Sequence, residues 1–532
     1  MGFAPLQPSA VNGKMARNPC QCEQPALMTS SKRAQGTTAG AFRALAAPRA
    51  APVAAPMSGC FGAAAACALL LAAPTHARAN DLLRLYGLAQ QRDSVLQSAA
   101  YQRDAAIEAR PQALAQWLPQ LAGSASTERE RLSQPASSFG IRPNQSGALP
   151  PLGSFGLPGC ELATEVTVRC NVNYTTYGLT LTQTVWSFQS YSQLREADSQ
   201  AASAEATFLS AQQKLVIRVA QAYFAVLQAQ DLLNTFTGER NAYATVLKQA
   251  QGRQQTGVGS ASEVKQAQAF FDQTAQNVIN AQNALDNATL ALGEIIGATP
   301  GHIAGLRDDI PLAAPDPVSV EAWVSAAESD NPDVRAAQLS SEAARRDIGV
   351  QRGRGLPSIA LSGTDTYATA PSLLGGHHGL DTVGIYFNWP LFQGGAVASA
   401  VRQSRALYRE SQANLTTLQR QTEQQTRSAY LGILSNIRGI NAARRAIDAA
   451  RAAVEAAQHD IEFDVGGGEY ALFNYQQLYY NAIYAYDQAR YAYLTSMLLL
   501  KQQAGRLSER DLASIDALLV TPGDAPAAGN GG

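Results

Sequence analysis

The strongest constraint on the fold is a seven-residue hydrophobic repeat in the C-terminal third of the chain. Residues 396–462 contain no proline, and apolar residues recur within them at Ile433, Ile440, Ile447, Val454 and Ile461. This spacing is typical of a coiled-coil seam. A glycine turn and a second proline-free run follow, so the sequence predicts two long antiparallel helices and a tip. At 1.5 Å per residue the first helix would extend roughly 100 Å.

The same order of elements occurs twice in the chain: helix, strand, loop, strand, long helix, glycine tip and returning helix. A repeated supersecondary unit of this kind indicates one architecture built from two halves. The sequence therefore predicts a first repeat at residues 80–300, a connector at 301–317 and a second repeat at 318–505. Residues 506–532 are interpreted as a C-terminal periplasmic piece with a disordered tail.

Within the first repeat we expect a helix at residues 81–109, a long loop at 129–169 and a long helix at 190–251. Ser262 is the predicted N-cap of the returning helix, and the second repeat opens with a helix at 318–349. The predicted seam of the first long helix consists of Leu209, Val216, Val219, Tyr223, Val226 and Leu233.

Each half also contains two segments of about ten residues in which apolar residues alternate with small or polar ones. In one of them Tyr177, Leu179 and Leu181 fall on one face and threonines on the other. Strands of outer-membrane barrels have this pattern. Four strands cannot close a barrel, and lipid does not tolerate an open sheet edge, so the chain must oligomerise. A trimer would give about twelve strands.

The N-terminal region has the features of an export signal. Residues 61–73 are apolar and Ala77-Arg78-Ala79 follows, which predicts cleavage before Asn80. Residues 1–79 are interpreted as a signal peptide with a long N-terminal extension, with Met28 or Met57 as candidate starts. A lipoprotein is the alternative, because cysteines lie nearby. No run of eighteen apolar residues follows Asn80, so we expect no transmembrane helix.

Two of the six cysteines, Cys160 and Cys170, follow Asn80. In an exported chain this pair predicts a disulfide that closes a small surface loop, with two free thiols as the alternative. The formal net charge is -1 and 16% of the residues are charged. This balance argues against nucleic acid as a partner.

Motifs at matching places in the two halves resemble the TolC family of outer-membrane efflux proteins. Before the first strand of each half stand Leu118-Pro119-Gln120-Leu121 and Leu356-Pro357-Ser358-Ile359. The strand-to-helix transitions read Leu181-Thr182-Gln183-Thr184-Val185-Trp186 and Asn388-Trp389-Pro390-Leu391-Phe392-Gln393-Gly394-Gly395. The resemblance covers nearly the whole chain after Asp81.

The resemblance implies a mainly α-helical homotrimer with a twelve-stranded barrel in the outer membrane of a Gram-negative bacterium. A periplasmic coiled-coil tunnel would continue this barrel. Such ducts dock onto a periplasmic membrane-fusion adaptor and an inner-membrane pump of the ABC or RND type. Their cargo is either small toxic compounds or a secreted protein.

The resemblance also places candidate site residues at the helical tips. The expected adaptor-docking turns are Gly257, Val258, Gly259, Val465, Gly466, Gly467 and Gly468. Family members have a polar latch and an aspartate ring near the second tip, where this chain has Phe463, Gly468, Leu472 and Tyr475. We therefore expect a constriction of Phe463, Leu472 and Tyr475, with acid from Glu263, Glu469 and Asp464. Such a pore would be less cation-selective than an aspartate-ringed one.

The sequence offers less support for two other classes of function. An enzyme is not expected, because the five histidines are scattered and the glycine tip lacks the lysine of a phosphate-binding loop. His377 and His378 are interpreted as part of a polar loop, so no metal or cofactor is expected. A non-channel surface or adhesive coiled-coil protein is the alternative, but it would not need two pairs of amphipathic strands.

Overall fold

The structure is a computed structural model that describes residues 81–139, 141–142, 160–164, 167–301, 303–369, 376–462 and 468–520. The predicted signal peptide and extension, the end of the tail and the tip residues Phe463, Asp464, Val465, Gly466 and Gly467 lie outside the described residues. None of the described helices is both long enough and apolar enough to cross a membrane.

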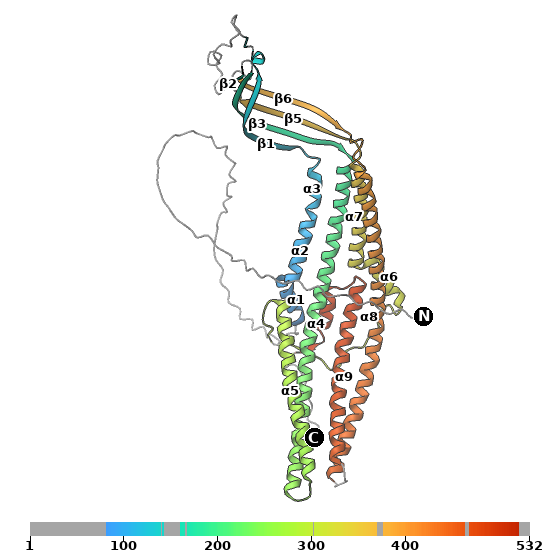
Figure 1. The fold of residues 1–532 in the computed structure, drawn as a ribbon. Coiled ribbons are helices and arrows are strands. Elements are labelled where there is room, and N and C mark those ends of the chain that lie inside the picture. The colour runs from blue at the N-terminus through green and yellow to red at the C-terminus, as the bar shows by residue number, and fades with distance from the viewer. Residues whose placement is uncertain are drawn as a thin grey trace, which may run out of the picture. The chain divides into compact units, whose positions relative to one another are not determined.

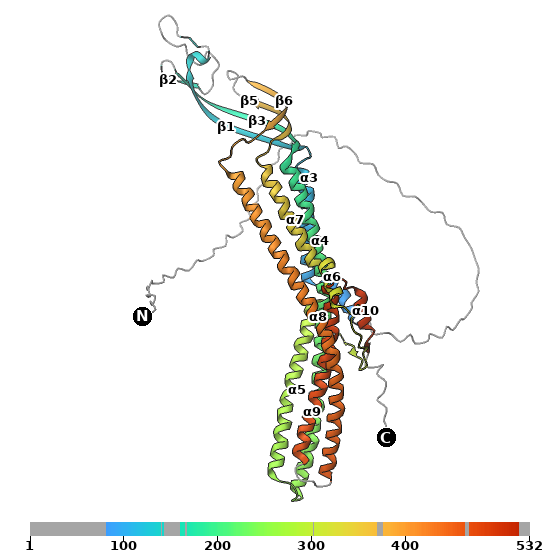
Figure 2. The same cartoon turned by 90° about the vertical axis from the view of Figure 1, so that its right-hand side faces the viewer.

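Two long helical hairpins confirm the main prediction (Figures 1 and 2). They consist of α4 (Phe188–Gln255) with α5 (Ala261–Ile296), and of α8 (Ala396–Glu462) with α9 (Gly468–Gln503). The two hairpins lie side by side, with α4 packed against α9.

The seam of α8 shifts along its length. Ile433 and Ile440 are buried, but nearer the tip the buried positions are those of Ala450 and Ala457. An α-helix drifts by roughly 20° per heptad relative to a strict seven-residue repeat, which moves the buried stripe. In α4, Leu209 is 49% exposed, so its assignment to the seam was wrong.

Proline explains two differences between the predicted and observed helices. The predicted helix at 318–349 is two helices, α6 (Val320–Asp330) and α7 (Pro332–Gly353). Asn331 between them is extended, as a residue before proline prefers, and its side chain caps α7. At the N-terminus, α1 (Asp81–Arg92), α2 (Ser94–Ile107) and α3 (Ala109–Ala115) run past the predicted end. Pro111 does not stop α3, because it lies in the first turn.

The strands form one antiparallel sheet in the order β1-β3-β5-β6, shown in Figure 1. Its members are β1 (Gln120–Pro135), β3 (Thr167–Ser187), β5 (Ser358–Thr369) and β6 (His377–Asn388), and the short β2 (Cys160–Thr164) pairs with β3.

The predicted loop at 129–169 was wrong in its outer parts, because β1 and β3 stay paired up to Pro135 and Thr167. A 3-10 turn, η1 (Ala136–Phe139), follows β1. The sequence did not indicate this extension, because charged residues such as Glu128 and Arg129 do not continue the apolar alternation. An exposed strand does not need an apolar face. His377 and His378 belong to β6 and not to a loop.

The C-terminal piece packs back onto the connector. α10 (Glu509–Asp516) is followed by β7 (Leu519–Val520), which pairs with β4 (Gly305–Leu306). The main core gathers buried side chains of α1, α4, α5, α9 and α10, including Leu82, Tyr223, Leu292, Leu500 and Leu512. Tyr223 Oη donates a 2.7 Å hydrogen bond to the Ala304 carbonyl, which ties the connector to α4. These contacts fix the base from which the long hairpins extend.

Candidate functional site

The sheet has two chemically different faces. The register aligns Leu121, Leu181, Gly363 and Val383 in one row, and Leu121 and Val383 are 69% and 83% exposed. The neighbouring row, on the opposite face, consists of Ala122, Thr180, Thr364 and Thr382. An exposed apolar face opposite a small, hydroxyl-bearing face is the arrangement of a barrel wall between lipid and water. Asp365 and Asp381, cross-strand partners on the apolar side, interrupt this pattern.

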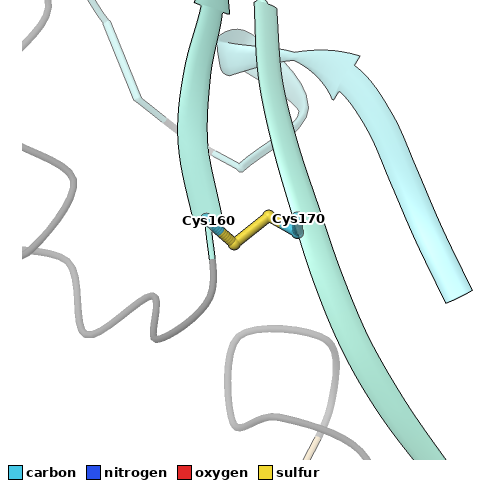
Figure 3. Close-up of a disulfide and its surroundings, with 2 residues drawn as sticks. All are labelled: Cys160 and Cys170. Carbon is cyan, nitrogen blue, oxygen red and sulfur yellow. A yellow bond between two sulfur atoms is a disulfide. The ribbon is translucent and has the colours of Figure 1, made fainter. Parts of the chain in front are cut away.

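A disulfide-bonded arm extends beyond the four-stranded part of the sheet. Pairing of β3 with β5 ends at Thr175 and Thr369, whereas β1 and β3 continue for eight further pairs. Cys160 and Cys170 are cross-strand partners of β2 and β3 and form a disulfide (Figure 3). Cys170 packs with Ile141 and Val168 in a small buried cluster. The predicted disulfide is therefore present, and the short segment that it closes, with a sequence separation of 10, is the β2/β3 hairpin of the arm.

The tip of the first hairpin is a fixed turn with an exposed apolar side chain. Gly257 has φ +81°, and the N–H groups of Val258 and Gly259 both donate to the Arg253 carbonyl at 3.0 and 2.9 Å. A Cβ at Gly259 would lie 2.9 Å from the Gln254 nitrogen. Val258 is 66% exposed. At the second tip, Gly468 is the first residue of α9.

Glu263 has a structural role beside this tip. Ser260 caps α5, so the predicted cap at Ser262 was wrong. The Glu263 carboxylate accepts from the Ser260 N–H at 3.1 Å, and Ser260 Oγ accepts from the Glu263 N–H at 3.2 Å. This capping box satisfies two N–H groups at the start of α5. It also fixes the position of the acid near the tip.

The predicted gate residues lie in different environments. Leu472 is 2% exposed and belongs with Phe473 and Gln476 to the buried stripe of α9, whereas Tyr475 is 39% exposed at the edge of that stripe. In the chain by itself Leu472 is thus a packing residue. Phe463 and the side chain of Glu469 lie outside the described residues.

Three aromatic rings join the two hairpins above the tips. Phe473 of α9 stacks on Phe270 of α5 at 4.8 Å and lies 5.5 Å from Tyr243 of α4, measured between ring centroids. Tyr243 and Phe270 are 5.7 Å apart. Tyr243 and Phe473 are 1% and 2% exposed. We call this set the aromatic clasp. Sequence reasoning missed it, although Tyr243 and Phe270 lie at similar distances on either side of Gly257.

A buried ionic network holds the connector against α4 and α9. Arg490, 4% exposed, donates to Asp487 Oδ1 at 3.1 Å and to the Arg307 carbonyl at 2.8 Å. Tyr491 donates to Asp231 Oδ2 at 2.5 Å. Burial, with the charge of Asp231, raises the pKa of Asp487 to about 7, and burial also raises the pKa of Asp231. Asp487 pairs with the buried Arg490 guanidinium and Asp231 with the Tyr491 hydroxyl, so burial and the repulsion between the two carboxylates together favour the protonated form of one of them.

In the part of the chain that the structure describes, no three His, Cys, Asp or Glu side chains are close enough together to hold a metal ion. His377 instead stacks on Tyr367 at 6.0 Å.

Comparison with known proteins identifies the family. The family model for "Outer membrane efflux protein" matches residues 85–298 and 323–506. The chain is 29% identical to the outer membrane protein TolC of Vibrio cholerae over 82% of this chain and 94% of that protein. It is 27% identical to the alkaline protease secretion protein AprF of Pseudomonas aeruginosa, covering 66% and 73% of the two chains.

The crystal structure of the CmeC outer membrane channel of Campylobacter jejuni superposes with a TM-score of 0.63 at 17% identity, over 83% of this chain and 90% of that one. Together these matches confirm the predicted fold class, a strand sheet of an outer-membrane barrel continued by a helical tunnel. They also confirm the outer-membrane location and the class of function, an export duct. The chain belongs to the outer membrane efflux protein family, whose members are channels rather than enzymes.

Proposed function

We propose that three copies of this chain form a continuous channel-tunnel that serves as the exit duct of a tripartite export machine. Its partners are a periplasmic membrane-fusion adaptor and an inner-membrane pump of the ABC or RND type. The outer-membrane lipid contacts the apolar face of the sheet, and the helices extend into the periplasm.

The observation that carries this proposal is the pair of open sheet edges. β1 and β6 end the sheet, and among the described residues each has a neighbouring strand on one side only. Unpaired backbone N–H and C=O groups are costly in lipid, so both edges need partners from further copies. Edge pairing of β6 with β1 of the next copy would close a barrel, and three copies give about twelve strands.

The tips are the proposed docking site of the adaptor. The hydrogen bonds around Arg253 hold the first tip in one conformation and present Val258 outward. A preorganised apolar contact favours binding, because little conformational entropy is lost on docking. The second tip, Val465, Gly466, Gly467 and Gly468, is assigned to the same docking site. The glycines of both tips, Gly257 and Gly259 included, have no side chain to hinder the close backbone approach that such docking needs.

The gate is proposed to be mainly apolar. Tyr475 and Phe463 form the narrowing, Leu472 supports it from the hairpin interior, and Glu263, Glu469 and Asp464 supply acid near it. Two carboxylates of an aspartate ring would attract multivalent cations, and this chain lacks them. High-affinity block by a trivalent cation that persists in Glu263→Gln would contradict this gate.

Purified mature protein in planar bilayers tests the duct. The expected result is a discrete single-channel conductance together with a detergent-stable trimer. Absence of both would instead favour a non-channel coiled-coil surface protein, which the family membership already disfavours.

We propose a secreted protein as the cargo, and a deletion strain tests this proposal. The relative from Pseudomonas aeruginosa is named for alkaline protease secretion, which supports a secreted protein as cargo. A strain that lacks this chain should then lose a protease from the medium. Loss of drug resistance with an unchanged set of secreted proteins would assign the duct to a multidrug pump.

A further inference from the structure

The outer part of the sheet carries a basic face. Cross-strand partners point to the same side of a sheet, and β1 pairs with β3 without a register shift from Gln120 to Pro135. The apolar face that contains Leu121 and Leu181 therefore continues into the disulfide-bonded arm. There it carries three arginines, which we call the basic face: Arg129, Arg131 and Arg169.

The three arginines are available to a partner. All of them are exposed. Arg131 Nε donates to Asn171 Oδ1 at 3.3 Å, which orders this side chain beside β3. Among the described residues no carboxylate pairs with any of the three guanidinium groups, and the terminal nitrogens of Arg131 donate no hydrogen bond. Several strong donors on this face are therefore free for a ligand.

The charge of the basic face is positive. In the described part of the arm the acid on it is Glu161, the cross-strand partner of Arg169. The two other acids of the described arm lie on the opposite face, namely Glu128 and Glu130. Asp365 and Asp381 share the face but belong to the four-stranded part, and their row crosses β1 six residues before Arg129. This separation is roughly 20 Å along the strand, so these carboxylates do not neutralise the basic face.

The basic face lies just beyond the membrane boundary. The arm is at the end of the sheet remote from the helices (Figure 1), and the helices extend into the periplasm, so the arm is on the cell-surface side. Tyr177 and Tyr367 are cross-strand partners on the apolar face and are 54% and 45% exposed. Tyrosines at such positions mark the edge of the hydrocarbon layer.

The arginines are at the right height for headgroups. Arg129 lies four residues beyond the row of Tyr177, which is about 14 Å along β1 and roughly 10 Å in height at a strand tilt of about 45°. The polar layer of one leaflet is about 5–7 Å thick. A long arginine side chain can extend towards this layer while its backbone stays outside it.

We propose that the basic face binds the phosphate groups of a phosphorylated glycolipid in the outer leaflet of the outer membrane. Arginine binds phosphate through paired N–H groups, and basic clusters beside a membrane-spanning segment attract anionic headgroups. Because the basic face continues the apolar face, one lipid can place its acyl chains against Leu121 and Leu181 and its phosphates on the arginines. This inference rests on the membrane face of the sheet and not on conduction through the duct.

Microscale thermophoresis on the detergent-solubilised mature protein tests the site with bisphosphorylated lipid A. The buffer contains EDTA, which removes divalent cations that would bridge phosphate groups. The same lipid without its phosphates is the matched probe. We expect the phosphorylated lipid to bind roughly 100-fold tighter, about fivefold for each arginine, and the preference to decrease as salt is added. The preference should disappear when all three arginines are replaced, in Arg129→Gln, Arg131→Gln and Arg169→Gln combined.

A charge-exchange variant separates the face from the net charge. It moves two arginines of β1 to the opposite face and leaves the composition unchanged, in E128R, R129E, E130R and R131E combined. This variant should also lose the preference for the phosphorylated lipid. Unaltered heat-modified gel mobility and an intact disulfide verify that the sheet and the arm still form.

A second control removes the same amount of charge far from the arm. It replaces three exposed arginines of α8, in R402Q, R405Q and R409Q combined. The preference for the phosphorylated lipid should stay as in the wild type, because these positions lie on the helical part of the chain.

Four results would overturn the proposal. They are equal affinity of the wild type for both lipids, an undiminished preference in the triple arginine variant, an undiminished preference in the charge-exchange variant, and displacement of the lipid by millimolar inorganic phosphate. The last result would assign the arginines to free phosphate. Loss of the oligomer in the triple variant at unchanged lipid affinity would assign them to subunit contacts, which also contradicts the proposal. A wild type that binds the lipid but conducts no current would refute the proposed duct instead.

Discussion

Phe473→Ala is expected to favour opening at the periplasmic end. Phe473 is 2% exposed and is the one member of the aromatic clasp from the α8/α9 hairpin, with ring contacts at 4.8 and 5.5 Å. Truncation of a buried phenylalanine to alanine typically costs about 3–5 kcal/mol. Its two ring pairs account for roughly 0.5–1.5 kcal/mol each of interaction beyond area burial.

The truncation destabilises the closed arrangement, in which the Phe473 ring is buried between the hairpins. The open arrangement is not destabilised, because separation of the hairpins already exposes the ring in the wild type. If about 3 kcal/mol of it is lost from the closed state alone, the ratio of open to closed channels rises roughly 150-fold. Single-channel recording measures this ratio directly. Opening should also admit a large antibiotic through the outer membrane, which a growth assay detects.

Phe224→Ala is the matched control. Phe224 is 3% exposed and lies 6.0 Å from Tyr491, but it belongs to the main core around the connector. The same truncation there should lower Tm by a similar amount without raising the open probability. If both variants open the channel equally, or neither does, the clasp is not the element that holds the tips together.

Three other perturbations test separate parts of the structure. Cys160→Ser should lower the stability of the arm by about 2–3 kcal/mol, which is the loop-closure value for a separation of 10 residues. Proteolysis of the arm on intact cells should become faster while the channel conductance stays unchanged. Equal cleavage rates in the variant and the wild type would argue against the disulfide. Gly257→Ala places a side chain at φ +81° and should therefore weaken adaptor binding by about 1 kcal/mol, measured by surface plasmon resonance. The control Gly252→Ala, inside α4, should leave adaptor binding unchanged. For Asp487 the folded-state pKa is raised to about 7, so its favourable contribution is complete below about pH 4 and is lost as the pH rises through about 7. Tm should therefore fall between pH 5 and 8, and a wild type that instead became more stable over this range would contradict the assigned burial and mutual repulsion of the Asp487 and Asp231 carboxyl groups.

The helices were predictable because their pattern repeats over many turns, whereas the arm was not. Ile433 and Ile440 identify α8 by their spacing alone, and the break at Asn331 could have been read from Pro332. In contrast, Glu128 and Arg129 lie on an exposed strand that is stabilised by backbone pairing with β3. The alternation of apolar and polar residues within one strand does not indicate whether a partner strand pairs with it. The aromatic clasp was missed for a related reason, since Tyr243, Phe270 and Phe473 come from three helices and only the tertiary fold brings them together.

The burial of Leu472 changes how closure of the duct is explained. Comparison with the polar residues of the family suggested that the constriction itself differs in chemistry, with Leu472 facing the pore. In the chain Leu472 is buried instead, in the same cluster as Tyr243 and Phe473. The free energy that keeps the tips closed can therefore come from apolar packing between the two hairpins of one chain. Such packing is weakened little by salt, unlike a ring of charges. A closed state held in this way should persist at an ionic strength that would screen a polar latch between exposed side chains.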